Sequence, residues 1–139
     1  FGVTLANNRP TLTTLPETIT IGDITPQGLP FYSGAITYHI EGLQNTLCSV
    51  TAPDFGGALL KLSGKEEVPL AFPPHKALIR DLNAIRLILT RRNTFGPLHH
   101  PEKRQYSYSP ASFITEPPCW TDSYVLYEQG LLKKPEILY

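Results

Sequence analysis

The 139 residues suffice for one globular domain with its own core, and a hydrophobic share of 41% excludes a disordered chain. Twelve basic and twelve acidic residues give a net charge of zero, which argues against a basic surface for nucleic acid. No apolar run approaches the ~20 residues that a membrane-spanning helix needs. We therefore expect neither nucleic acid nor a membrane as a partner.

The chain begins at Phe1 and contains no methionine, so we expect a segment excised from a larger multidomain protein. Its 14 prolines are spread along the whole sequence, and only 17% of the residues are charged. Prolines distributed in this way are typical of turns and sheet edges in a β protein.

Short strand signals recur along the chain, whereas helical signals are nearly absent. Runs rich in β-branched, aromatic and aliphatic residues are bounded by Gly, Pro, Asp or Ser. We expect strands at residues 18–21, 31–40, 46–51, 58–63, 68–72, 84–90, 124–127 and 137–139, and a short helical turn at 77–82.

The longest expected strand covers residues 31–40. Its alternation places Tyr32 and Tyr38 on the apolar face, so both side chains are expected in the core. Residues 46–51 are expected to pair with it through the turn at residues 41–42.

The next hairpin is expected to turn at residues 63–65, because Ser-Gly-Lys commonly closes two short strands. Pro69 cannot donate a backbone hydrogen bond, which predicts that the returning strand lies at a sheet edge. Turn signals at intervals of roughly 8–12 residues favour an all-β fold, an antiparallel β-sandwich of jelly-roll type, over residues 1–139.

Residues 91–121 depart from this rhythm. They contain five prolines, two adjacent histidines and Trp120. Long irregular segments inside a compact domain are usually functional, so this stretch is predicted to be a docking or binding loop.

Two stretches carry a family likeness. Gly28, Pro30, Tyr32, Gly34 and Tyr38 have the spacing of the entry strand of galactose-binding-like jelly-roll domains in bacterial glycoside hydrolases. A second match comes from the late loop of such domains, and its residues are Arg92, Asn93, Gly96, Pro97 and His99. The hairpin at residues 62–65 is similar as well, with Ser63 in place of the more usual Asn.

The likeness covers roughly residues 15–132 and most resembles the sugar-binding domain of glycoside hydrolase family 2. It implies a galactose-binding-domain-like fold and an accessory, non-catalytic role, since catalysis in that family lies in a separate barrel. Carbohydrate and neighbouring domains of a parent enzyme are the implied partners, in the bacterial cytoplasm or secreted with that enzyme.

The candidate contact residues lie in or beside the long loop. Arginine, asparagine and aromatic side chains are the groups that fork onto hydroxyls or stack on a sugar ring. The candidates for contact with carbohydrate or a partner domain are Arg91, Arg92, Asn93, His99, His100, Tyr108, Trp120 and Tyr124, with Tyr106 as a further aromatic. The alternative for the arginines and Asn93 is that they tie the loop to itself.

No catalytic residue and no metal ligand set are predicted. A glycosidase needs two carboxylates across a cleft, and the acidic residues of this chain mostly fall in turns. His99 and His100 lack a second ligand pair, since His39 and His75 are isolated. No cofactor is expected, although Asp54 or Asp81 could join a structural calcium site.

Cys48 and Cys119 permit one disulfide but are expected to be free thiols. Three functions follow from the residues and the likeness. The first is a non-catalytic accessory domain of a carbohydrate-active enzyme, the second an autonomous carbohydrate-binding module, and the third a small cupin-like metal-dependent enzyme.

Overall fold

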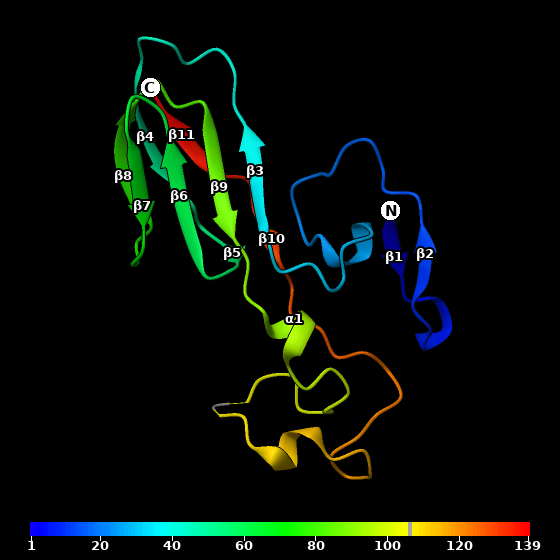
Figure 1. The fold of residues 1–139 in the computed structure, drawn as a ribbon. Coiled ribbons are helices and arrows are strands. Elements are labelled where there is room, and N and C mark those ends of the chain that lie inside the picture. Colours follow the sequence, from blue (N-terminus) through cyan, green and yellow to red (C-terminus); the bar gives the residue numbers. More distant parts are fainter. Residues whose placement is uncertain (106) are drawn as a thin grey trace. The chain divides into compact units, whose positions relative to one another are not determined.

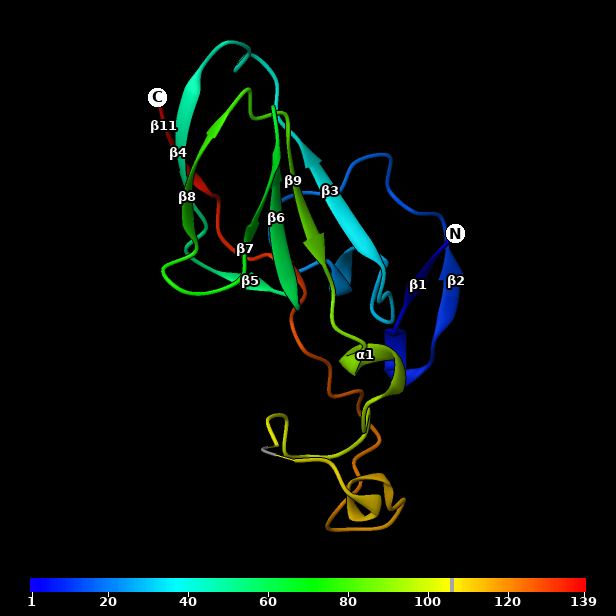
Figure 2. The ribbon, with the colours of Figure 1, turned by 60° about the vertical axis from the view of Figure 1, so that its left-hand side comes forward.

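The computed structural model describes residues 1–105 and 107–139, and these form two compact units. The first unit comprises residues 1–19, 24–33 and 91–128. The second comprises residues 20–23, 34–90 and 129–139 and holds most of the strands (Figures 1 and 2). The described residues of the predicted 91–121 loop belong to the first unit, and the single-domain organisation stays a prediction.

The second unit is built from antiparallel sheets (Figure 1). Four strands form the larger sheet, in the order β3 (Ala35–His39), β9 (Ala84–Ile88), β6 (Leu59–Ser63) and β7 (Glu67–Leu70). Three strands form the next sheet, in the order β11 (Glu136–Leu138), β4 (Leu47–Thr51) and β8 (Lys76–Arg80). A two-stranded sheet pairs β10 (Gly130–Leu131) with β5 (Phe55–Gly56). The all-β, antiparallel β-sandwich prediction is confirmed, and its jelly-roll connectivity stays a prediction.

The core of this unit follows from strand alternation. Leu60 on β6 lies opposite Leu87 on β9, Leu62 lies opposite Ile85, and all four side chains are buried. The side chains between them, such as Lys61, point to the other face, because successive residues of a strand alternate. The three-stranded sheet repeats this pattern and buries Cys48, Val50 and Ile79.

The predicted β6–β7 hairpin is confirmed, and so is the edge position of the strand that contains Pro69. The predicted pairing of residues 31–40 with residues 46–51 is wrong. β3 pairs with β9, while β4 pairs with β8 and belongs to the other sheet. Chain neighbours commonly pair, but here burial of alternate side chains selects partners from farther along the chain.

Four other local predictions are also wrong. Residues 77–82 lie mainly in strand β8, because five backbone partners on β4 outweigh a weak helical preference. Residues 18–21 and 124–127 form no strand. Tyr32 is 41% exposed and is not part of the core, because β3 begins only at Ala35.

The first unit has little regular structure. β1 (Gly2–Thr4) and β2 (Thr11–Thr13) form a small hairpin, and the one α-helix among the described residues, α1 (Arg92–Phe95), has a single turn. Short 3-10 turns cover Ala6–Asn8, Thr25–Gln27 and Pro110–Phe113. Within the part of the chain that the structure describes, no helix has the length and apolar character required to cross a membrane.

We expect Leu87→Ala to lower the free energy of unfolding by about 2–5 kcal/mol, because it leaves a cavity in the fully buried core. Leu78→Ala removes the same atoms from an exposed position of β8 and should cost less than about 0.5 kcal/mol. Urea denaturation of both variants measures the difference. Equal losses would contradict this assignment of the core.

A second prediction concerns Tyr38 on β3, whose hydroxyl accepts a hydrogen bond from the Leu131 amide at 3.0 Å. Burial raises the pKa of this hydroxyl, and the Leu131 N–H opposes the rise. A raised folded-state pKa contributes stability below the ordinary value of about 10, and that contribution is lost as the pH rises through the folded value. Above about pH 10 the free energy of unfolding should therefore fall more steeply for the wild type than for Tyr38→Phe.

The matched control for this measurement is Tyr139→Phe, because the Tyr139 ring is 85% exposed. Denaturant titrations at a series of alkaline pH values compare the three proteins. Identical pH slopes for Tyr38→Phe and the wild type would refute the role of Tyr38.

Candidate binding segment of the first unit

The segment that contains most of the predicted contact residues begins at α1. Helix α1 ends just before Gly96, where a Cβ atom would lie 2.4 Å from the Arg92 carbonyl oxygen and 2.5 Å from Arg92 Cδ. Any larger residue would push the buried Arg92 side chain aside. The Gly96-Pro97 step then ends the helix and starts the irregular chain that follows.

The Arg92 side chain is buried, and its guanidinium group contacts three other residues of the first unit. Its Nε donates to the Tyr108 hydroxyl at 3.1 Å and one Nη2 hydrogen is donated to the Pro97 carbonyl at 3.1 Å. The guanidinium carbon lies 4.7 Å from the centroid of the Tyr127 ring, a cation–π distance. Burial and a hydrogen bond with the Tyr127 hydroxyl raise the pKa of Tyr108. Arg92 therefore links three parts of the segment.

Asn93 is fully buried and joins α1 to the returning chain. Its Nδ2 donates to the Tyr127 carbonyl, and its Oδ1 accepts from the Tyr127 amide, both at 2.7 Å. The side chain thus replaces one rung of a β-ladder, and its complete burial closes both amide atoms to an external ligand. Thr94 adds a hydroxyl bond of 2.7 Å to the Phe31 carbonyl.

His99 stands in the middle of a chain of four rings. Its imidazole stacks on Trp120 with centroids 4.1 Å apart and tilts against Tyr124 at 4.4 Å. Tyr124 in turn meets Phe31 edge-on at 5.4 Å. His99 Nδ1 lies 3.0 Å from the Thr121 carbonyl, so this nitrogen carries the proton and donates it.

His100 turns to different partners, as neighbouring residues of an extended chain do. Its Nδ1 accepts from the Glu102 amide at 3.1 Å, and the Gln105 side chain lies 3.2 Å from Nε2. Both imidazoles therefore bond loop backbone, His99 through the Thr121 carbonyl and His100 through the Glu102 amide. The two rings have different hydrogen-bond partners, although both line the cavity described next.

A cavity of about 220 Å³ opens beside the ring chain. Its walls are mainly apolar, with a few polar groups. The lining residues are Gly96, Pro97, Leu98, His99, His100, Ser112, Phe113, Ile114, Cys119 and Trp120. Pockets for drug-sized ligands measure about 300–1,000 Å³, so this one has room for a single ring or side chain.

Many of the polar atoms around the cavity already have partners. Trp120 Nε1 donates to Asp122 Oδ1 at 3.1 Å, and Ser112 Oγ accepts from the Ser109 amide at 3.2 Å. By contrast, Phe113 and Ile114 are 53% and 46% exposed at the cavity wall. The site therefore presents apolar surface more than hydrogen-bonding groups.

The structure gathers some of the predicted contact residues and separates others. His99, Trp120 and Tyr124 form one cluster, whereas Arg92 and Tyr108 form another. Arg91 is exposed just before α1. Tyr106 lies outside the described residues.

Sequence reasoning missed several residues of the segment. Phe113 and Ile114 carry no distinctive motif, although Ser109-Pro110 just before them is a common start of a helical turn. Tyr127 was expected in a strand, and instead its backbone carbonyl accepts from the Asn93 side chain and its amide donates to it. No sequence pattern identifies that role.

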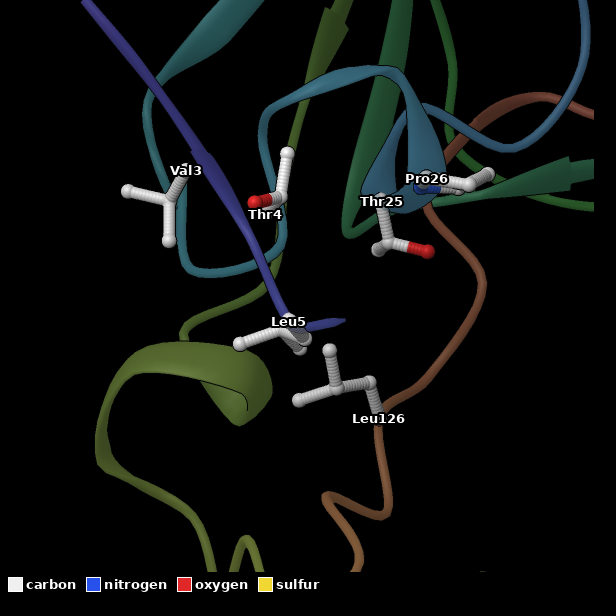
Figure 3. Close-up of a pocket in the computed structure, with 6 residues that line it drawn as sticks. All are labelled: Val3, Thr4, Leu5, Thr25, Pro26 and Leu126. Carbon is white, nitrogen blue, oxygen red and sulfur yellow. The ribbon is translucent and has the colours of Figure 1, made fainter. Parts of the chain in front are cut away.

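A second hollow of the first unit, of about 380 Å³, lies beside the β1–β2 hairpin (Figure 3). Leu5 and Leu126 point toward one another across it. The lining is Val3, Thr4, Leu5, Thr25, Pro26 and Leu126. None of these six side chains is an acid, a base or a metal ligand of the usual kind, so this hollow offers no acid–base chemistry.

In the described part of the chain, the candidate metal ligands and the two cysteines are not grouped into a metal site. Among residues 1–105 and 107–139, no three His, Cys, Asp or Glu side chains are grouped to hold a metal ion. Asp81, which was named with Asp54 as a residue that could join a calcium site, accepts a short hydrogen bond from the Asn45 amide. Cys48 and Cys119 are both free thiols, as expected, and Cys119 lines the cavity beside Trp120.

We expect Asn93→Asp to lower the free energy of unfolding at pH 7 by about 2–4 kcal/mol, because a buried carboxylate would face the Tyr127 carbonyl without a donor. Burial should raise the pKa of the new acid, so the loss should shrink as the pH falls and the protonated acid donates to that carbonyl. Denaturant unfolding at about pH 4 and pH 7 measures this. Arg91→Ala, at the exposed neighbour, is the control, and a pH-independent loss for Asn93→Asp would rule out the proposed pairing.

No protein-family model, curated protein or solved structure matches this chain. The likeness to galactose-binding-like domains therefore stays a prediction.

Proposed function

We propose that this chain is a non-catalytic accessory module of a carbohydrate-active enzyme, and that residues 91–121 dock it onto a neighbouring domain. The observation that carries the proposal is that this segment buries key polar side chains and exposes large apolar ones. Arg92 and Asn93, which could have served a ligand, are buried and bond internal carbonyls. Apolar side chains of the same segment face solvent instead.

The exposed apolar groups are large. Phe95 is 71% exposed, Phe113 53%, Tyr108 48% and Ile114 46%. Isolated exposed apolar residues are ordinary, but several in one segment are typical of a protein contact surface. A neighbouring domain that covers them would complete the burial that the first unit lacks, since its own regular elements are short.

A binding role also agrees with the positions of the Asp and Glu carboxyl groups relative to the two cavities of the first unit. Catalysis of glycoside hydrolysis needs two carboxyl groups that face each other across the substrate. Neither of the two cavities described for the first unit has an Asp or Glu in its lining. This supports contact and shaping of a neighbouring site as the role of the module.

A second candidate is autonomous carbohydrate binding, which the Trp120 cavity favours. Small-ligand pockets are mainly apolar and aromatic with a few polar groups, and this cavity has that composition. One sugar ring could lie against Trp120 and Phe113. The shortage of unused polar atoms around the cavity makes this the weaker candidate.

We expect the purified chain to show no hydrolysis of aryl glycosides and no binding on a glycan array. It should bind a dye for apolar surface such as ANS, and Phe113→Ser or Ile114→Ser should reduce that binding while leaving the unfolding curve unchanged. Leu12→Ser, at an exposed residue outside residues 91–121, is the control.

The possible outcomes separate the candidates. Glycan binding that Trp120→Ala abolishes would replace docking by autonomous carbohydrate capture. Hydrolysis that copurifies with the chain and disappears on substitution of one acidic residue would overturn the non-catalytic role. Dye binding unaffected by both serine substitutions would remove the proposed docking surface.

A further inference from the structure

The outer face of the three-stranded sheet in the second unit carries exposed leucines. One face of β4 and β8 is buried and holds Cys48 and Ile79. On the opposite face, Leu47 is 51% exposed, Leu78 65% and Leu138 67%. Side chains on this face belong to alternate residues of β8, β4 and β11, which lie side by side in both views of the ribbon (Figures 1 and 2).

The strand register places the residues of this face in three rows. The middle row is Leu78 on β8, Ser49 on β4 and Leu138 on β11. The next row is Lys76, Thr51 and Glu136. The third row is Arg80 and Leu47, and no residue of β11 continues it.

The charges on this face are arranged asymmetrically. β8 at one edge contributes Lys76 and Arg80, β11 at the other edge contributes Glu136, and the central strand β4 contributes no charged side chain. A two-fold axis parallel to β4 and above this face would therefore place the basic edge strand β8 of one copy opposite the acidic edge strand β11 of another.

We propose that a second copy of this chain docks on this face through such a two-fold axis. Packed sheets lie about 10 Å apart with strands roughly aligned, so each row would meet the same row of the other copy in reverse order. Lys76 would face Glu136 of the second copy, and Leu78 would face its Leu138. The symmetry produces each of these contacts twice, and it places Leu47 against Leu47, as in an isologous interface.

A hollow at the β8 edge fits this arrangement. It measures about 420 Å³ and lies where the turn of the β6–β7 hairpin reaches β8. Its lining is Leu47, Lys65, Glu66, Leu78, Ile79 and Arg80. Because Leu78 belongs to both the hollow and the middle row, Leu138 of the second copy is the side chain positioned to enter it, in the manner of an interface anchor.

The chemistry of the face favours a protein partner over a glycan. Its apolar side chains are leucines, whereas sugars stack on flat aromatic rings. Two strands of five residues and one of three cover at most about 14 by 17 Å, well below the roughly 800 Å² per partner of stable complexes. We therefore expect a weak dimer, with a dissociation constant of about 0.1–1 mM.

Sedimentation equilibrium of the full chain between about 10 µM and 1 mM tests the proposal. The weight-average mass should rise from that of the monomer toward that of the dimer. Lys76→Glu turns two attractive contacts into two repulsive ones and should weaken association by about tenfold or more. Leu138→Ser should also weaken it, because the anchor is lost.

The decisive variant is the charge exchange Lys76→Glu with Glu136→Lys, which should restore association to near the wild-type level. Arg80→Glu makes the same change of charge on β8 but faces no residue of β11, so Glu136→Lys should not rescue it. Circular dichroism of each variant checks that the fold is retained. These experiments do not depend on the proposed accessory role.

Each alternative result counts against the proposal. A chain that stays monomeric up to about 1 mM has no such dimer. Association that Lys76→Glu leaves unchanged uses another surface. A double exchange that fails to restore association, with the fold intact, rejects the two-fold pairing of β8 with β11.

Discussion

The core of the second unit sets the constraint on which the rest of that unit depends. Leu60 and Leu62 of β6 pack beside Leu87 and Ile85 of β9, and the register that brings them together is the one that removes all four from water. A slip of one residue would turn Lys61 inward and the leucines outward, at a cost of several kcal/mol. The register that buries these four side chains thus also fixes the strand order and the face of the sheet on which the charged side chains lie.

The strand register also determines which side chains lie on the outer faces of the sheets. Alternation buries Cys48 and Val50 of β4 and by the same geometry presents Leu47 and Ser49 to solvent. The exposed leucines of this face are therefore a consequence of the register, because they occupy the strand positions whose side chains point away from the core. Their pairing with opposite charges on the two edge strands is a property that only the assembled sheet possesses, and it suits association between copies.

The first unit is stabilised in a different way. Its described residues form one short hairpin, one turn of α-helix and a few 3-10 turns. Side-chain hydrogen bonds therefore replace much of the backbone ladder that a sheet would supply. Asn93 replaces a rung opposite Tyr127, and the Arg92 guanidinium spans Tyr108 and Pro97. Polar groups are used internally and apolar ones remain at the surface, and this is the arrangement on which the proposed docking role rests.

Composition and local pattern determined the all-β class, most strand positions, the hairpin at residues 63–65 and the edge strand with Pro69. These features depend on neighbours within a few residues, through alternation and the missing N–H of proline. The pairing of β3 with β9, the strand at Lys76–Arg80 and the burial of Asn93 were decided only by tertiary structure. Each of them requires a partner tens of residues away along the chain, and the free energy of that long-range contact outweighs the local preference from which a sequence pattern is read.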